Sequence, residues 1–109
     1  MENKLKTIAD FYTLETQSRQ LNEELAELIQ ANSKYLRYSN SDMEWKYLQN
    51  ICEEVADVQI MIEQMLYLLD IDKQAIEEIK MKKIDRQLER IKVEKEKEEW
   101  QKEECLQKQ

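Results

Sequence analysis

The sequence predicts an all-α protein, a bundle of about four helices that assembles as an oligomer. Glycine and proline are both absent, charged residues make up 38% of the chain, and apolar residues recur at helical spacing. Because the two strongest helix breakers are missing, the connections must be short and built from Asn, Asp and Ser. We expect one main domain, residues 1–93, followed by a charged C-terminal helix extension or tail, residues 94–109.

The first part of the chain is expected to contain a short helix or arm and then one long helix. The short element covers about residues 3–12, and the long helix runs from about Thr13 to Tyr38. Its one-sided apolar stripe consists of Leu21, Leu25, Leu28, Ile29 and Leu36. A loop at residues 38–42 follows, and Ser41 with Glu44 has the spacing of a capping box for the next helix.

A third helix, over about residues 42–70, is apolar on most sides and must therefore be covered on most sides. We expect other copies of the chain to cover it, with a tetramer favoured and a dimer possible. The expected subunit contacts are Met61, Met65, Tyr67 and Leu68. Asp70-Ile71-Asp72 ends this helix, and Asp72 is the expected N-cap of a last helix that frays toward Gln109.

Charge and composition exclude several classes of function. The net charge is −7, which argues against a nucleic-acid partner because such binding needs a basic surface. Residues 73–109 hold 11 of the 17 Lys+Arg and 10 of the 24 Asp+Glu, which leaves 6 and 14 for residues 1–72. No apolar run is long enough for a membrane span and no signal peptide is recognised, so we expect a cytoplasmic protein with reduced Cys52 and Cys105.

Two acidic segments repeat with the same pattern. Glu23-Glu24-Leu25-Ala26-Glu27 matches Glu53-Glu54-Val55-Ala56-Asp57 position by position, at an offset of 30 residues (23 to 53). At about 100° per residue, each segment places an i,i+3 carboxylate pair on the same flank of its apolar stripe. If the two helices pack antiparallel, Glu24, Glu27, Glu54 and Asp57 can border one groove.

Four carboxylates beside an apolar core repel one another, and burying them is unfavourable unless they are paired. A divalent cation is the simplest compensation, and Mg²⁺ usually takes carboxylates together with water and substrate phosphates. With no histidine in the chain, a hard ion held by oxygen is the expected chemistry. The alternative is that each segment is an ordinary solvated helix face, and the matched second copy is what favours a metal site.

The pattern Glu-Glu-x-x-Glu, followed by Glu-x-x-Asp on a second helix, resembles the all-α nucleoside triphosphate pyrophosphohydrolases. This superfamily includes the MazG-like enzymes, the dimeric dUTPases and the dCTP pyrophosphatases. The resemblance covers about residues 14–91 and is greatest to the small phage- and Firmicute-type MazG-like proteins. It takes in a basic segment, residues 80–86, although Asp85 stands where relatives often have Asn.

The resemblance implies Mg²⁺-dependent cleavage of a nucleoside triphosphate between its α- and β-phosphates, giving a nucleoside monophosphate and pyrophosphate. Such enzymes control nucleotide pools or remove non-standard nucleotides. The implied metal ligands are Glu24, Glu27, Glu54 and Asp57, and Glu23 or Glu53 would orient or deprotonate the attacking water. Candidate phosphate-binding residues, otherwise ordinary helix surface, are Lys80, Lys82, Lys83 and Arg86. Trp45 is a candidate for stacking on the base, or a packing residue.

Two other interpretations remain open. The chain could be a non-enzymatic coiled-coil interaction protein that uses the helix from Lys73 onward, although its apolar stripe fades after Ile91. It could also be a member of the superfamily that has kept the bundle and lost turnover. Pyrophosphate release from nucleotides with and without Mg²⁺ distinguishes these readings.

Overall fold

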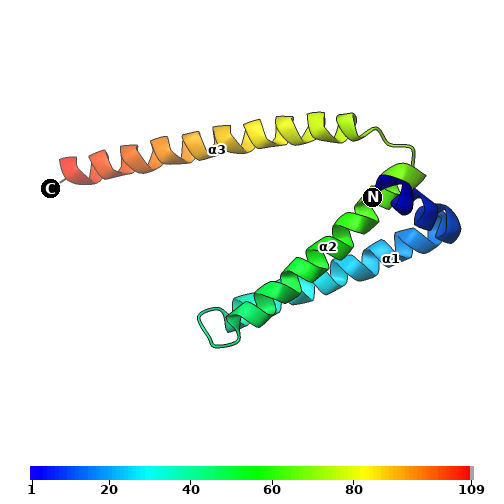
Figure 1. Cartoon of the computed structure of the whole chain (residues 1–109). Coiled ribbons are helices and arrows are strands. Elements are labelled where there is room, and N and C mark those ends of the chain that lie inside the picture. The colour runs from blue at the N-terminus through cyan, green and yellow to red at the C-terminus, as the bar shows by residue number, and fades with distance from the viewer. Residues whose placement is uncertain (109) are drawn as a thin grey trace. The chain divides into compact units, whose positions relative to one another are not determined.

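The computed structural model describes residues 1–108, and within them it has three helices and no strand (Figure 1). Helix α1 spans Glu2–Tyr38, α2 spans Glu44–Leu68 and α3 spans Lys73–Gln107. The all-α prediction is confirmed. The helix count is three because the short helix expected near the N-terminus and the long helix after it are joined across a kink at Thr13 and together form α1. None of these helices has both the length and the apolar character needed to cross a membrane.

Helix α1 is interrupted at a single residue. Thr13 has φ 71° and ψ 166°, a backbone conformation that is otherwise almost confined to glycine. A β-branched residue in this region costs on the order of 1–3 kcal/mol, which the surrounding packing must offset. The interruption lies where the sequence predicts the long helix to begin, although no glycine or proline marks it.

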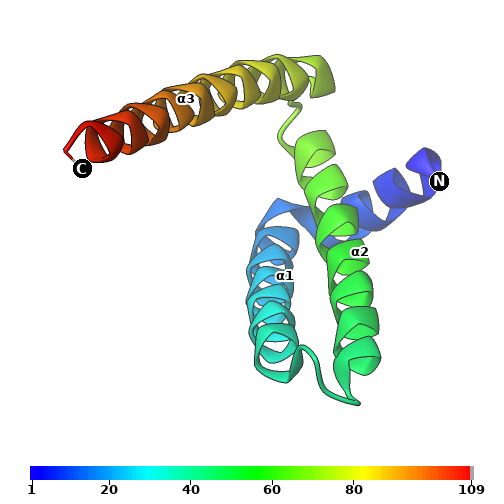
Figure 2. The same ribbon diagram turned by 90° about the vertical axis from the view of Figure 1, so that its left-hand side faces the viewer.

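The chain divides into two compact units, Met1–Ile71 and Asp72–Gln109. In the first unit, α1 and α2 form an antiparallel hairpin, which Figure 2 shows with the loop at one end. The capping box predicted at this loop is wrong. The Ser41 hydroxyl instead accepts a hydrogen bond from the Met43 backbone N–H at 3.2 Å, and the Glu44 carboxylate accepts one from the Tyr35 hydroxyl at 3.4 Å. Helix α2 therefore begins at Glu44, two residues later than expected.

The C-terminus of α2 ends in a Schellman motif without a glycine. The Ile71 N–H donates to the Leu66 carbonyl at 2.9 Å, and the Asp70 N–H donates to the Tyr67 carbonyl at 3.1 Å. Asp70 adopts the required left-handed conformation, with φ 53°, which aspartate tolerates better than most residues. The Asp72 carboxylate then accepts from the Gln74 N–H at 3.0 Å, which confirms the predicted N-cap of α3.

The interior of the hairpin is small and partly polar. Its buried apolar residues are Ala9, Ala31, Val58 and Met61. Two buried glutamines lie among them, and the Gln17 Nε2 atom donates to the Gln64 Oε1 atom at 2.6 Å. Because a buried amide without a partner is costly, this bond fixes the alignment of α1 against α2.

Burial within one chain corrects the expected subunit contacts in part. Met61 is only 6% exposed, so it belongs to the interior of the hairpin and is not available to a second subunit. Tyr67 is 38% exposed, and its hydroxyl donates to the Asp10 carboxylate at 2.8 Å. Much of the predicted apolar stripe of α1 remains uncovered, with Ile29 at 67% and Leu36 at 66% exposure. Within α3 no residue is buried.

Candidate metal centre

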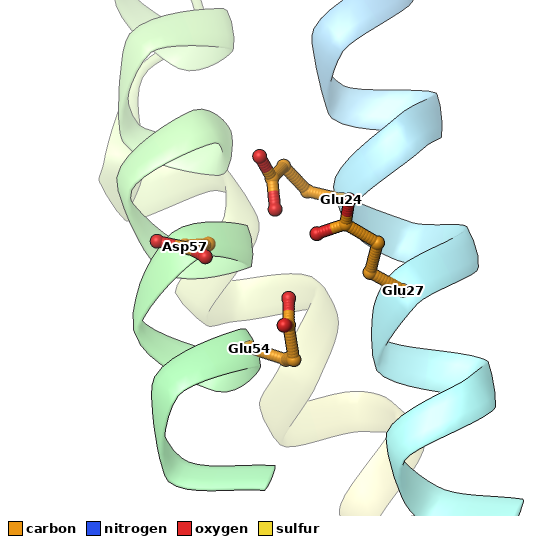
Figure 3. A group of neighbouring side chains, drawn as sticks. All are labelled: Glu24, Glu27, Glu54 and Asp57. Atoms are coloured by element: carbon orange, nitrogen blue, oxygen red, sulfur yellow. The ribbon is translucent and has the colours of Figure 1, made fainter. Parts of the chain in front are cut away.

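Four carboxylates from the two helices of the hairpin meet at one place. Each of Glu24, Glu27, Glu54 and Asp57 offers one carboxylate oxygen, and these four oxygens all lie within 4.8 Å of one another. Figure 3 shows the two pairs facing each other across the space between α1 and α2. The predicted convergence of the repeated acidic segments is therefore observed. The role of these residues as metal ligands remains a prediction.

The antiparallel register explains why the repeat brings the pairs together. Residues equally far from the centre of the loop lie at the same level of a hairpin. Gln17 and Gln64 are hydrogen-bonded to each other, and their residue numbers (17 and 64) add to 81. The residue numbers of Glu24 and Asp57 (24 and 57) also add to 81, and so do those of Glu27 and Glu54 (27 and 54). The glutamine pair and the two carboxylate pairs thus share one register. An i,i+3 spacing on both helices then matches across the hairpin.

Two of the four carboxylates carry an oxygen without a protein partner. The Oε2 atoms of Glu24 and Glu54 are buried, and neither accepts a hydrogen bond. The other oxygen of Glu24 accepts from the Gln20 Nε2 atom at 2.8 Å. Among residues 1–71, no lysine or arginine forms an ion pair with any of the four carboxylates. Buried carboxylate oxygens normally have partners, so these two are open to a hydrogen-bond donor or a cation.

The protonation of Glu24 reflects this environment. Its hydrogen bond from Gln20 favours the charged form, but burial and the neighbouring carboxylates of Glu27 and Asp57 together outweigh it. The net result is a pKa of Glu24 raised above its ordinary value of 4.5. Burial and the neighbouring carboxylates thus both oppose ionisation of Glu24, and a bound cation would relieve the repulsion.

The arrangement fits a hard divalent cation. All four donors are carboxylate oxygens, which Mg²⁺ and Ca²⁺ prefer. Oxygens bound to one Mg²⁺ lie at most about 4.2 Å apart, twice the bond length of about 2.1 Å, so the cluster would contract by less than about 1 Å. Glu24 and Glu54 are half-buried, whereas Glu27 and Asp57 are exposed. On each helix the cluster thus has one half-buried and one exposed carboxylate.

The predicted catalytic residues lie beside this cluster. Glu23 and Glu53 are both exposed, and each is one position before a member of the cluster. Adjacent helical residues diverge by about 100°, so neither belongs to the converging set. Trp45 is 69% exposed in the first turn of α2. Their proposed roles in activating water and stacking on a base stay predictions.

The predicted phosphate-binding residues lie in the second unit. Lys80, Lys82, Lys83 and Arg86 are all exposed on α3. The Lys80 Nζ atom pairs with the Glu77 carboxylate at 3.0 Å, an ordinary i,i+3 surface ion pair. Their role toward phosphate stays a prediction.

Sequence reasoning missed one residue that contacts the carboxylates. Gln20 supports Glu24 by a hydrogen bond, and its i,i+4 spacing from Glu24 was a readable signal. Tyr38 and Tyr47 stack on each other across the loop, with ring centroids 4.7 Å apart and planes 13° apart. Cys52 and Cys105 are both exposed free thiols.

Comparison with known proteins adds no family to this description. The chain matches no protein-family model, no curated protein and no solved structure.

Proposed function

We propose that this protein is a Mg²⁺-dependent nucleoside triphosphate pyrophosphohydrolase. It would cleave between the α- and β-phosphates and release a nucleoside monophosphate and pyrophosphate. The observation that carries the proposal is that four carboxylates each place one oxygen within 4.8 Å of the others. Two of these carboxylates also have a buried oxygen without a hydrogen-bond partner. The sequence resemblance to MazG-like proteins supplies the reaction.

Each acidic residue has a distinct part in this proposal. Glu24, Glu27, Glu54 and Asp57 would hold the ion, which would supply Lewis-acid chemistry by making water more acidic and offsetting charge on the phosphates. Glu23 or Glu53 would take the proton of the attacking water. Both are exposed, so each is open to solvent and substrate. The water oxygen would form a bond to the α-phosphorus while the bond from that phosphorus to the α,β-bridging oxygen breaks, so that pyrophosphate leaves and the nucleoside monophosphate remains.

We also propose that the protein acts as a homo-oligomer, with a tetramer favoured and a dimer possible. A two-helix hairpin with four buried apolar residues is too small a core for independent stability. Leu48, Ile60 and Ile62 on α2 remain 43–49% exposed within one chain. Sedimentation at micromolar concentration tests this proposal, and a 13.3 kDa monomer would contradict it.

The test of the enzymatic proposal is pyrophosphate release from a panel of ribo- and deoxyribonucleoside triphosphates. We expect release in the presence of Mg²⁺, equimolar formation of the monophosphate, and no release in EDTA. Absence of turnover with every nucleotide, together with a melting temperature that ignores Mg²⁺, would overturn it.

A second candidate is a non-enzymatic helical interaction protein, and one observation favours it. Helix α3 has no buried residue, and Ile84, Leu88 and Ile91 are 48–59% exposed along it. Such a stripe is typical of a helix that pairs with another helix. The same assay separates the candidates, because this one requires neither Mg²⁺ nor nucleotide.

A further inference from the structure

An open groove lies near the loop end of the hairpin. Its volume is about 470 Å³, and it is bordered by α1 and the first turns of α2. The lining residues are Lys34, Lys46, Tyr47, Gln49, Asn50 and Glu53. None of them was singled out from the sequence as phosphate-binding.

The groove continues the face of the hairpin that carries the carboxylates. Tyr47, Asn50, Glu54 and Asp57 follow one another at spacings of three and four residues, which places them along one stripe of α2. Lys34 and Tyr47 share the register of the carboxylate pairs, because 34 and 47 also add to 81. From Glu54 to Asn50 is four residues, about 6 Å along the helix, and to Tyr47 about 10 Å. A phosphate chain that begins at the carboxylates therefore reaches the groove.

The chemistry of the lining favours an anion. Five of the six side chains carry hydrogen-bond donors: two ammonium groups, two amides and one phenol. Residues 1–72 are strongly acidic, yet two of their six Lys and Arg residues border this one groove. Glu53 is the exception, and it leaves the lining with a formal charge of +1. Glu53 directly precedes Glu54 on α2, so it is the lining residue of α2 that is closest in sequence to the carboxylate cluster.

We infer that this groove binds the phosphate tail of the substrate and the pyrophosphate that leaves it, with Lys34 and Lys46 as the principal cationic contacts. The assignment deepens the proposed function and rests on it for the identity of the tail. It places the α-phosphate at the carboxylates and the β- and γ-phosphates toward the loop. Ammonium groups and amide N–H groups stabilise the charge that the leaving pyrophosphate acquires.

The experiment measures binding of inorganic pyrophosphate to the full chain by calorimetry, with and without Mg²⁺, in four proteins. These are wild type, Lys34→Gln, Lys46→Gln and Lys4→Gln. The Lys4 variant is the matched control, since it makes the same charge change at the other end of α1. We expect each groove variant to weaken pyrophosphate binding at least about tenfold, which is about 1.4 kcal/mol, because each loses a charge-assisted hydrogen bond to phosphate. The control should bind like wild type.

Steady-state kinetics supply an independent readout. For a nucleoside triphosphate, Lys34→Gln and Lys46→Gln should raise KM and weaken inhibition by pyrophosphate, while nucleoside monophosphate inhibition stays unchanged. Equal pyrophosphate affinity in the groove variants and in Lys4→Gln would overturn the inference, even if the protein is an active hydrolase. Lysine-dependent pyrophosphate binding by a protein that hydrolyses no nucleotide would support the groove and contradict the proposed function. Circular dichroism melting confirms that each variant is folded.

Discussion

Residues 1–71 and residues 72–108 are both almost entirely helical, but their helices depend on different interactions. In the first region α1 and α2 pack against each other and bury a glutamine pair and four apolar side chains. In the second region no residue is buried, and the side-chain interactions include an N-cap and exposed ion pairs between neighbouring turns. Helix α3 therefore depends largely on local propensity and capping, whereas the hairpin depends on packing.

The same contrast separates two ways of using acidic residues. Glu94-Lys95-Glu96-Lys97 on α3 alternates charges that solvent screens, and such exposed pairs contribute little. The carboxylates of Glu24 and Glu54 are half-buried at a helix interface without a basic partner. Glutamate side chains therefore have little effect on stability on α3, but they repel one another in the carboxylate cluster. Substitutions that exchange glutamate for glutamine test this difference directly.

The largest expected effect is on catalysis in Glu54→Gln. If Glu54 is a metal ligand, the amide should lower nucleotide hydrolysis by at least about 100-fold, because a ligand to the ion contributes several kcal/mol of transition-state stabilisation. The apo protein should melt at the same temperature or slightly higher, since one member of a repelling cluster is neutral. Glu96→Gln on α3 is the matched control and should leave both properties unchanged.

Melting temperature supplies the second half of that test. Mg²⁺ with a non-hydrolysable nucleotide should raise the melting temperature of wild type and of Glu96→Gln but not of Glu54→Gln, because selective binding to the native state stabilises it. A wild-type melting temperature that does not change on addition of metal and nucleotide would count heavily against the site. Equal activity in Glu54→Gln and wild type would contradict the ligand role itself.

The next largest effect concerns the stability of the hairpin. Gln64→Leu removes the acceptor of the buried Gln17 amide, and we expect a loss of about 1–3 kcal/mol in the free energy of unfolding. That loss lowers the melting temperature by about 4–8 °C per kcal/mol for a region of this size. The double variant Gln17→Leu/Gln64→Leu should recover most of it, because no buried polar group is left unpaired. Gln87→Leu on exposed α3 is the control, and a comparable loss there would show that α3 is also packed.

Because of Glu24, the stability of the hairpin should depend on pH. Its pKa is raised in the folded state, so the unfolded chain releases its proton first as the pH rises. Glu24 therefore favours folding most below its ordinary pKa of 4.5, and this contribution is lost as the pH rises through the higher folded value. We expect the apo melting temperature of wild type to fall, relative to Glu24→Gln, across that window. Mg²⁺ should remove the difference at neutral pH in wild type, and identical pH profiles for both proteins would contradict the repulsion.

The same residues show which features of the structure can be predicted from the sequence. The 30-residue repeat predicted that Glu24, Glu27, Glu54 and Asp57 converge, since spacing on two antiparallel helices determines register. The pairing of Gln17 with Gln64 was not predictable, because a helical glutamine is normally exposed and its burial depends on the partner helix. Met61 was misassigned for a related reason. An apolar position shows that burial is needed and does not show whether the same chain or another one covers it.

Of the two turn predictions, one was confirmed and the other was wrong. Asp70-Ile71-Asp72 was predicted as a break, and both a left-handed aspartate and an N-cap appear there. The Ser41 and Glu44 spacing suggested a capping box, but Glu44 is engaged by Tyr35 from the facing helix. A local motif therefore failed where a tertiary contact competed for the same side chain. The positive φ at Thr13 has no local signal, because neither glycine nor asparagine occupies that position.

A smaller effect is expected at the start of α3. Asp72→Ala removes the carboxylate that caps the Gln74 N–H, and N-cap loss costs about 0.5–2 kcal/mol of helix stability. Because α3 buries no residue, this loss should appear as reduced helical signal at 222 nm in circular dichroism. The main cooperative melting of the hairpin should not shift. Asp42→Ala, an exposed loop residue, is the control, and a large shift of the main transition in Asp72→Ala would contradict the separation of the two regions.

The smallest effect should follow removal of residues 94–109. Ten of the sixteen residues in this stretch are charged, and its large apolar residues Trp100 and Leu106 are 64% and 71% exposed. Its ion pairs, Lys97 with Glu94 at 3.9 Å and Lys108 with Glu104 at 3.5 Å, are exposed i,i+3 and i,i+4 pairs worth about 0.3–0.5 kcal/mol each. Truncation after Val93 should therefore reduce the helical signal only by the residues removed, while the melting temperature and any hydrolase activity stay close to those of the full chain. Removal of residues 1–12 is the counterpart in the other region and should destabilise the hairpin, because Ala9 is fully buried and Asp10 accepts the hydrogen bond of Tyr67. A fall of many degrees on C-terminal truncation would show that the tail is packed in the working assembly, and that α3 resembles the hairpin more closely than a single chain indicates.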